Sequence, residues 1–241
     1  SGTVYAKSVE GDMTSVAINS DGSFEVEVAD ADGPYVLMAD GTSDGNPVTL
    51  YSISEGAGRA NITPVTNIIV ALAVQDDPSI AFPVSEMTAQ GELTNVIPAV
   101  DTAKASIEGF IENVYPAFDI AVDFDVITGQ FSADSTGFDL LLDKVDFTVE
   151  TDGADKLVRV KAEDDGTVYY EQDVKASAPT VNDPAGFESK FHDMAAPKLT
   201  GITISTNSVN TNAGDVEIDV TVTGTDNLSG INSIEVSFVS P

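Results

Sequence analysis

The chain has 241 residues, of which 42% are hydrophobic and 21% charged, a composition that supports a folded core. Forty Asp and Glu residues face ten Lys and Arg residues, which gives a formal net charge of -30. Binding to phosphates needs clustered cations, so this charge argues against nucleic acid and anionic membrane surfaces as partners. The chain lacks cysteine, which excludes disulfides, thiolate metal sites and a cysteine nucleophile.

Residues 1–60 alternate between apolar and polar side chains in short segments, which indicates β-strands. Acidic-glycine pairs such as Asp21-Gly22 separate the segments and predict turns. Regular short strands with such turns favour a small β-sandwich. The predicted strands are residues 3–9, 14–20, 23–29, 34–39 and 48–53.

Three runs within residues 1–39, SGTV, NSDGSFEVEV and PYVL, resemble segments of bacterial carboxypeptidase-regulatory-like domains. The resemblance implies a transthyretin-like β-sandwich. In such proteins this domain is usually a non-catalytic part of a secreted or surface protein.

The most apolar run, residues 68–74, is too short to span a membrane, which takes about 20 residues. Thr63 followed by Pro64 is typical of an N-cap with proline at the first helical position, and Pro78 marks the end. Because apolar side chains occur on nearly all sides, we expect a helix buried in the core.

More helices and a β-meander are predicted up to residue 175. Apolar spacing favours an amphipathic helix from near Pro98 to before Pro116, and a shorter helix capped by Ser135 or Thr136. The runs NITPVTNIIVALA and GFDLLLDKVDFTV are similar to a helical insert in uncharacterised bacterial lipoproteins, a likeness that implies no particular activity. The predicted meander strands are residues 146–153, 156–164 and 166–174.

Residues 176–196 are rich in Ala, Pro and Ser, which predicts a linker. Beyond it, the Pro197 start and the runs VEIDVTVTGTDNLSG and INSIEVSFVSP resemble bacterial Ig-like repeats of large extracellular proteins. Only about three strands fit into residues 197–241, whereas an Ig-like sandwich has about seven. Either the chain continues beyond Pro241 or a strand from another molecule completes the sheet.

The predicted fold class is therefore mainly β with an α+β middle region. Residues 1–60 form a β-sandwich, 61–175 a helical insert with a three-strand meander, 176–196 a linker, and 197–241 a partial Ig-like sandwich.

Local patterns point to no catalytic centre. The single histidine, His192, lies in the predicted linker, a poor base for a rigid catalytic imidazole. The densest carboxylates beside aromatic residues are Asp119, Asp123 and Asp125, which indicate a solvated loop edge or, alternatively, a sugar or metal site.

Calcium is the ligand that this composition favours, because Ca²⁺ prefers six to eight oxygen ligands. The candidate metal site consists of Asp193, Asp226 and Asn227, and it would join the linker to the Ig-like loop. Alternatively, Asp226 and Asn227 only cap a turn.

We expect a non-catalytic structural or adhesive module of an exported bacterial surface protein, without a membrane-spanning segment. Its expected partners are other surface proteins, extracellular matrix or further copies of the chain. One alternative is a subunit of an extracellular fibre, completed by strand exchange in trans. Another is an accessory region of a secreted polysaccharide- or peptide-processing enzyme.

Overall fold

The computed structural model describes residues 2–28, 33–43, 45–82, 90–192, 194, 197–205 and 218–225. Within these residues the protein is mostly β, with three antiparallel sheets and four α-helices. It therefore has a β-rich α+β fold, which confirms the predicted combination of mostly β-structure with helices.

The first sheet has four antiparallel strands in the order β2-β1-β3-β4. Val36 of β3 lies opposite Ile53 of β4 in its register. The strands are β1 (Gly2–Ser8), β2 (Met13–Ala17), β3 (Tyr35–Ser43) and β4 (Asn46–Ser54). Every strand predicted in this part of the chain is confirmed except the one at residues 23–29.

That prediction is wrong for the described residues 23–28, which form no strand. A turn precedes them, where the backbone N–H of Asn19 donates to the oxygen of Ser23 at 2.9 Å. Beyond the turn, Val26 and Val28 pack against one face of the sheet instead of extending its edge. The alternation in this segment reflects contact with a sheet face and not a ladder of hydrogen bonds.

The most apolar run forms helix α1 (Pro64–Val74), as predicted. The backbone N–H of Thr63 donates to the Thr66 hydroxyl at 2.9 Å, and the N–H of Thr66 donates to the Thr63 hydroxyl at 3.2 Å. Gln75 ends the helix in the left-handed conformation, before Pro78 begins the 3-10 helix η2 (Pro78–Ala81). Most side chains of α1 are buried, so it is a core helix, as expected.

Helix α2 (Gln90–Ile111) is already helical well before its predicted start near Pro98, which is therefore wrong. Pro98 lacks an N–H and cannot donate to the carbonyl four residues earlier. Val96 and Val100, on either side of the proline, both pack against the main core, and this packing stabilises the helix. A 3-10 helix, η3 (Glu112–Phe118), continues the chain. Among the described residues, no helix combines the length and apolar character that crossing a membrane requires.

The second sheet has the strand order β5-β6-β7-β8. Helix α3 (Gly137–Lys144) precedes it and has Thr136 at its N-cap, one of the two predicted residues. Gly153 and Gly166 lie in the turns with φ angles of 63° and 70°, which glycine adopts without strain. The predicted meander is confirmed and gains a fourth strand. The strands are β5 (Val145–Asp152), β6 (Asp155–Ala162), β7 (Val168–Asp173) and β8 (Val181–Asn182).

The interpretation of residues 176–196 as a linker is wrong for a large part of the segment. Strand β8 pairs with β7, and helix α4 (Pro184–Lys190) follows it. Phe187 and Phe191 are buried in the main core, where the ring centroid of Phe187 lies 5.0 Å from that of Phe110. Burial of these two rings fixes the segment to the rest of the fold.

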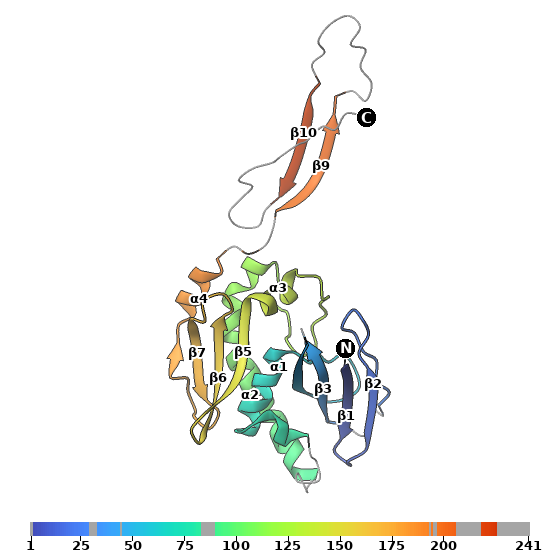
Figure 1. Ribbon diagram of the computed structural model, residues 1–241, viewed down its shortest axis with the longest axis vertical. Coiled ribbons are helices and arrows are strands. Elements are labelled where there is room, and N and C mark those ends of the chain that lie inside the picture. The colour runs from blue at the N-terminus through green and yellow to red at the C-terminus, as the bar shows by residue number, and fades with distance from the viewer. Residues whose placement is uncertain are drawn as a thin grey trace, which may run out of the picture.

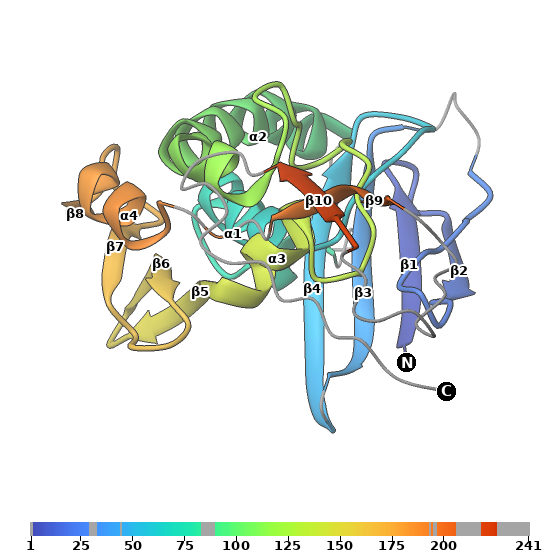
Figure 2. The ribbon, with the colours of Figure 1, turned by 90° about the horizontal axis from the view of Figure 1, so that it is seen from above.

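Helices α1 and α2 lie between the two larger sheets, whereas α4 lies beside β7 at the outer end of the second sheet (Figure 1, Figure 2). Helix α1 contacts β4 of the first sheet, β5 and β6 of the second, and helix α2. One core cluster runs from Val36 to Phe191, so the predicted boundary at residue 60 does not divide the core. We call the described residues from 2 to 192 the body.

The third sheet is a hairpin of β9 (Lys198–Ile204) and β10 (Val220–Thr225), which projects from the body (Figure 1). The Lys198 ammonium contacts the carboxylate of Asp119 in the body. Because this pair is exposed on both sides, it contributes little to stability.

Candidate functional site

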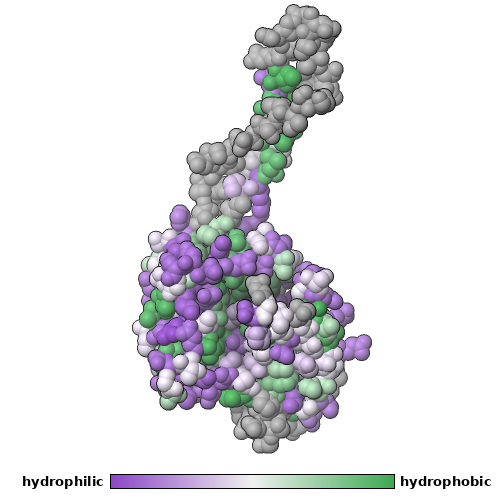
Figure 3. Space-filling view, in the orientation of Figure 1, coloured by the Kyte–Doolittle hydropathy of each residue, from purple (hydrophilic) through white to green (hydrophobic). Residues whose placement is uncertain are grey.

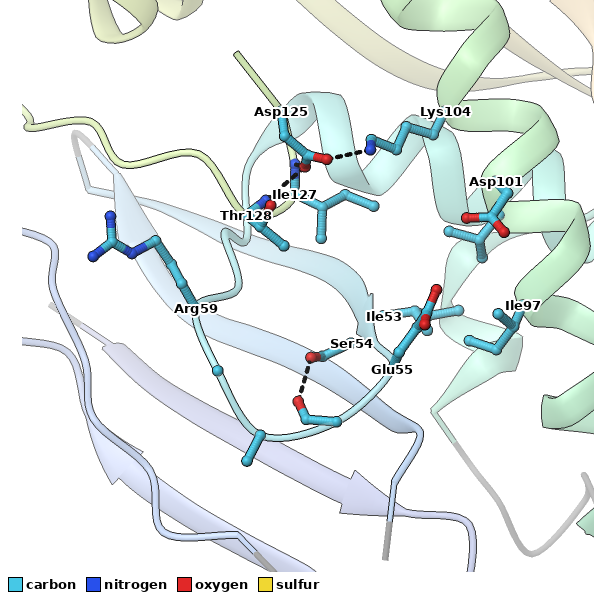
Figure 4. A pocket seen from close by; sticks show the side chains of 14 residues that line it. Ile53, Ser54, Glu55, Arg59, Ile97, Asp101, Lys104, Asp125, Ile127 and Thr128 are labelled. Carbon is cyan, nitrogen blue, oxygen red and sulfur yellow. Dashed lines mark hydrogen bonds and ion pairs between the residues drawn. The ribbon is translucent and has the colours of Figure 1, made fainter. Parts of the chain in front are cut away.

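A pocket of about 340 Å³ opens between three segments that are far apart in the sequence. They are the loop after β4, helix α2 and residues 125–128 (Figure 4). The lining includes aliphatic side chains from the end of β4, from helix α2 and from residues 125–128, namely Ile53, Ile97, Val100 and Ile127. A concave site of this size with an apolar lining fits a small molecule.

An ion pair between Lys104 and Asp125 forms one wall of the pocket (Figure 4). Burial alone would lower the pKa of Lys104, but the hydrogen bond to Asp125 and the charge of Glu108, 3.9 Å away, raise it. Burial opposes ionisation of Asp125, yet the hydrogen bonds from Lys104 and the backbone lower its pKa. Both groups are therefore charged at neutral pH, and the charge of Lys104 is compensated.

Glu108 is partly buried beside this ion pair, and Tyr115 is fully buried. Burial raises the pKa of Glu108, whose Oε1 accepts a hydrogen bond from the backbone N–H of Val126 at 3.1 Å. The Tyr115 hydroxyl is buried without a hydrogen-bond partner among the described residues. Burial, assisted by nearby carboxylates, raises the pKa of Tyr115, so the phenol stays protonated at neutral pH.

The loop at residues 125–128 is held rigidly. Oδ1 of Asp125 accepts hydrogen bonds from the backbone N–H groups of Ile127 and Thr128, each at 2.8 Å. The side-chain amide of Asn61 donates to the backbone oxygens of Val126 and Gly129 at 3.1 and 2.9 Å. These bonds fix the pocket wall without any ligand.

Two further carboxylates line the pocket, and the charge of one of them, Asp101, contributes to raising the pKa of Lys104. Glu55 and Asp101 form no ion pair or hydrogen bond among the described residues. Both side chains extend into the space between the loop after β4 and helix α2 (Figure 4). Arg59 also lines the pocket, but its guanidinium extends away from these two carboxylates. The uncompensated charge facing the cavity is therefore negative.

The hairpin carries a second candidate surface, an apolar face. Ile202 lies opposite Val222 and Ile204 opposite Val220, so these four side chains share one side of the ladder. Ile202 and Ile204 are 57% and 54% exposed, and apolar surface is visible along the hairpin in Figure 3. We call these four residues the hairpin face.

The predicted calcium ligands Asp193, Asp226 and Asn227 lie outside the described residues. Within the described part of the chain, no three His, Asp or Glu side chains are grouped so that they could hold a metal ion. His192 is exposed and follows Phe191, the C-cap residue of helix α4.

The carboxylates of Asp119, Asp123 and Asp125 do not form one site. Asp125 pairs with Lys104, Asp119 pairs with Lys198, and Asp123 is exposed. Sequence reasoning missed the Lys104–Asp125 pair because the two residues are 21 positions apart and share no local motif.

Comparison of the chain with family models, curated proteins and solved structures finds no match. The function must therefore be argued from the residues of this chain.

Proposed function

We propose that the chain is a non-catalytic structural module of an exported bacterial surface protein. In this proposal the body carries the hairpin, which is the first part of an Ig-like sheet. The main support for this proposal is the hairpin face, because a two-stranded sheet with an uncovered apolar face is marginally stable alone. We therefore expect further β-structure to cover this face.

The first sheet supports the finer proposal of a transthyretin-like sandwich. Both of its faces are covered, one by the main core and the other by the segment at residues 23–28 together with Ala60 and Ile62. The segment at residues 23–28 would be the second layer of the sandwich.

We also propose that Asp193, Asp226 and Asn227 are ligands of a calcium ion. The support is chemical, because two carboxylates and an amide supply the oxygen ligands that Ca²⁺ prefers. Calcium there would stiffen the junction between the body and the Ig-like sheet.

A fibre subunit is the second candidate. Among the described residues the hairpin is two-stranded, so each strand has one edge that another molecule could pair with. Light scattering over a range of chain concentrations separates the two proposals. Completion within one molecule predicts a monomer, and completion in trans predicts oligomers that disappear when Ile202 and Ile204 are both replaced by threonine.

Labelling of intact cells tests the location. Because the chain has no cysteine, Glu188→Cys on the exposed side of α4 provides a unique thiol. A maleimide that cannot cross membranes should label this variant in intact cells of the bacterium that produces it. Labelling that occurs only after lysis would contradict the proposed export.

A further inference from the structure

We propose that the pocket between the loop after β4, helix α2 and residues 125–128 binds a compact organic cation, an ammonium group on an apolar body. This inference concerns the body alone and is independent of the structural role proposed for the hairpin.

The floor of the pocket is apolar and already formed. Ile53 and Val100 belong to the main core and are only 3% and 5% exposed. Ile53 is held in β4 by its pairing with Val36 of β3. An aliphatic or aromatic ligand body can therefore be buried against side chains that need not move. A cavity of about 340 Å³ accommodates a ligand the size of a small aromatic amine.

The side walls are also fixed before any ligand binds. The side chain of Asp125 closes the turn at Ile127 and Thr128, and Lys104 contacts the same carboxylate. Asn61 fastens this loop to the segment that enters α1. A site with fixed walls loses little conformational entropy on binding.

Charge selects a cation over an anion. The charge of Lys104 is compensated by Asp125 and Glu108. Asp101 and Glu55 also line the pocket and form no ion pair among the described residues; although the charge of Asp101 acts on Lys104, the carboxylates around the pocket outnumber this one ammonium. An ammonium between these carboxylates forms charge-assisted hydrogen bonds, whereas a ligand carboxylate is repelled. The net charge of -30 adds long-range attraction for any cation.

Three probes that share a phenylethyl group and differ in charge test this selection. They are 2-phenylethylamine, 2-phenylethanol and 3-phenylpropanoate, titrated against the ¹⁵N-labelled chain and followed by amide chemical shifts. We expect the amine to bind with a dissociation constant of about 1 mM, as for a small fragment, and to bind more tightly than the other two. The shifts should be centred on the loop after β4 and on residues 97–104. No binding of the amine, binding of the carboxylate with equal affinity, or shifts centred elsewhere would each overturn the proposal.

A variant and a matched control separate a specific site from general attraction to an acidic surface. Asp101→Asn keeps the side-chain shape, and because Asp101 is exposed the fold should tolerate the change. It should weaken binding of 2-phenylethylamine about three- to tenfold. Asp143→Asn removes the same charge from an exposed position on α3 that does not line the pocket, and it should leave the affinity unchanged. Equal effects of the two variants would show non-specific attraction and would contradict the proposed site.

Discussion

The side-chain nitrogen of Asn61 donates a hydrogen bond to the backbone oxygen of Gly129 over 2.9 Å, although the two residues are 68 positions apart. The backbone N–H of Asn61 also donates to the oxygen of Ile127 at 2.7 Å. Asn61 therefore joins the segment that enters α1 to the loop that walls the pocket.

Replacing Asn61 by alanine should lower the free energy of unfolding by about 1–3 kcal/mol, because two partly buried backbone oxygens lose their donor. Urea unfolding followed by circular dichroism measures the change. Asn113→Ala is the control, since the Asn113 amide reaches only carbonyls of its own helical segment at 3.3 and 3.4 Å. Equal losses in the two variants would contradict the role assigned to Asn61.

The cap of α1 depends on a hydroxyl at position 66. Thr66→Val keeps the side-chain volume but leaves the N–H of Thr63 without its acceptor in a buried site, which should cost about 1–3 kcal/mol in unfolding free energy. Thr66→Ser keeps the hydroxyl and should cost about 1 kcal/mol or less. If the valine variant were the more stable of the two, methyl packing and not the hydrogen bonds would stabilise the cap.

The segment containing α4 should behave as part of the body. Phe187 is fully buried and contacts the rings of Phe110, Tyr169 and Phe191. Phe187→Ala should therefore lower the unfolding free energy of the body by about 3–5 kcal/mol. Glu188→Ala, on the exposed side of the same helix, should change it by less than about 0.5 kcal/mol. A loss below about 1 kcal/mol for the phenylalanine variant would mean that α4 is loosely attached.

The raised pKa of Glu108 predicts a specific pH dependence. Burial favours the neutral carboxyl in the folded state, so its stabilising effect is fully present below the ordinary pKa of glutamate. That effect is lost as the pH rises through the raised pKa of the folded state. Relative to Glu108→Gln, the wild type should lose stability as the pH rises above about 4, the ordinary pKa of glutamate. Glu188→Gln, at an exposed position in α4, is the control; a pH-independent difference for Glu108→Gln would contradict the prediction.

Local signals explain which helices could be predicted. The N-cap and proline at Thr63-Pro64 specify the start of α1 by short-range hydrogen bonding alone. The same signal occurs at Asp183-Pro184, where the carboxylate accepts a hydrogen bond from the N–H of Gly186 at 2.9 Å. Helix α4 was nevertheless not predicted, because the Ala, Pro and Ser residues around this signal indicated a linker.

The pocket could not be predicted, because no local pattern brings its three segments together. Lys104 meets Asp125 only after α2 packs on α1 and the Asn61 side chain binds the following loop. The hairpin, in contrast, follows from the alternation of Ile202 and Ile204 with threonine, although alternation alone does not say what covers its face.

The central claim is that further β-structure covers the hairpin face when the protein is isolated from the cells that produce it. Thiol reactivity at Ile202→Cys, on the hairpin face, and at Thr203→Cys, on the opposite side of β9, tests it directly. If further β-structure covers the face, a maleimide should modify the cysteine at position 202 at least about tenfold more slowly than the one at position 203. Equal rates at the two positions would mean that the face stays open to solvent, and they would contradict the account.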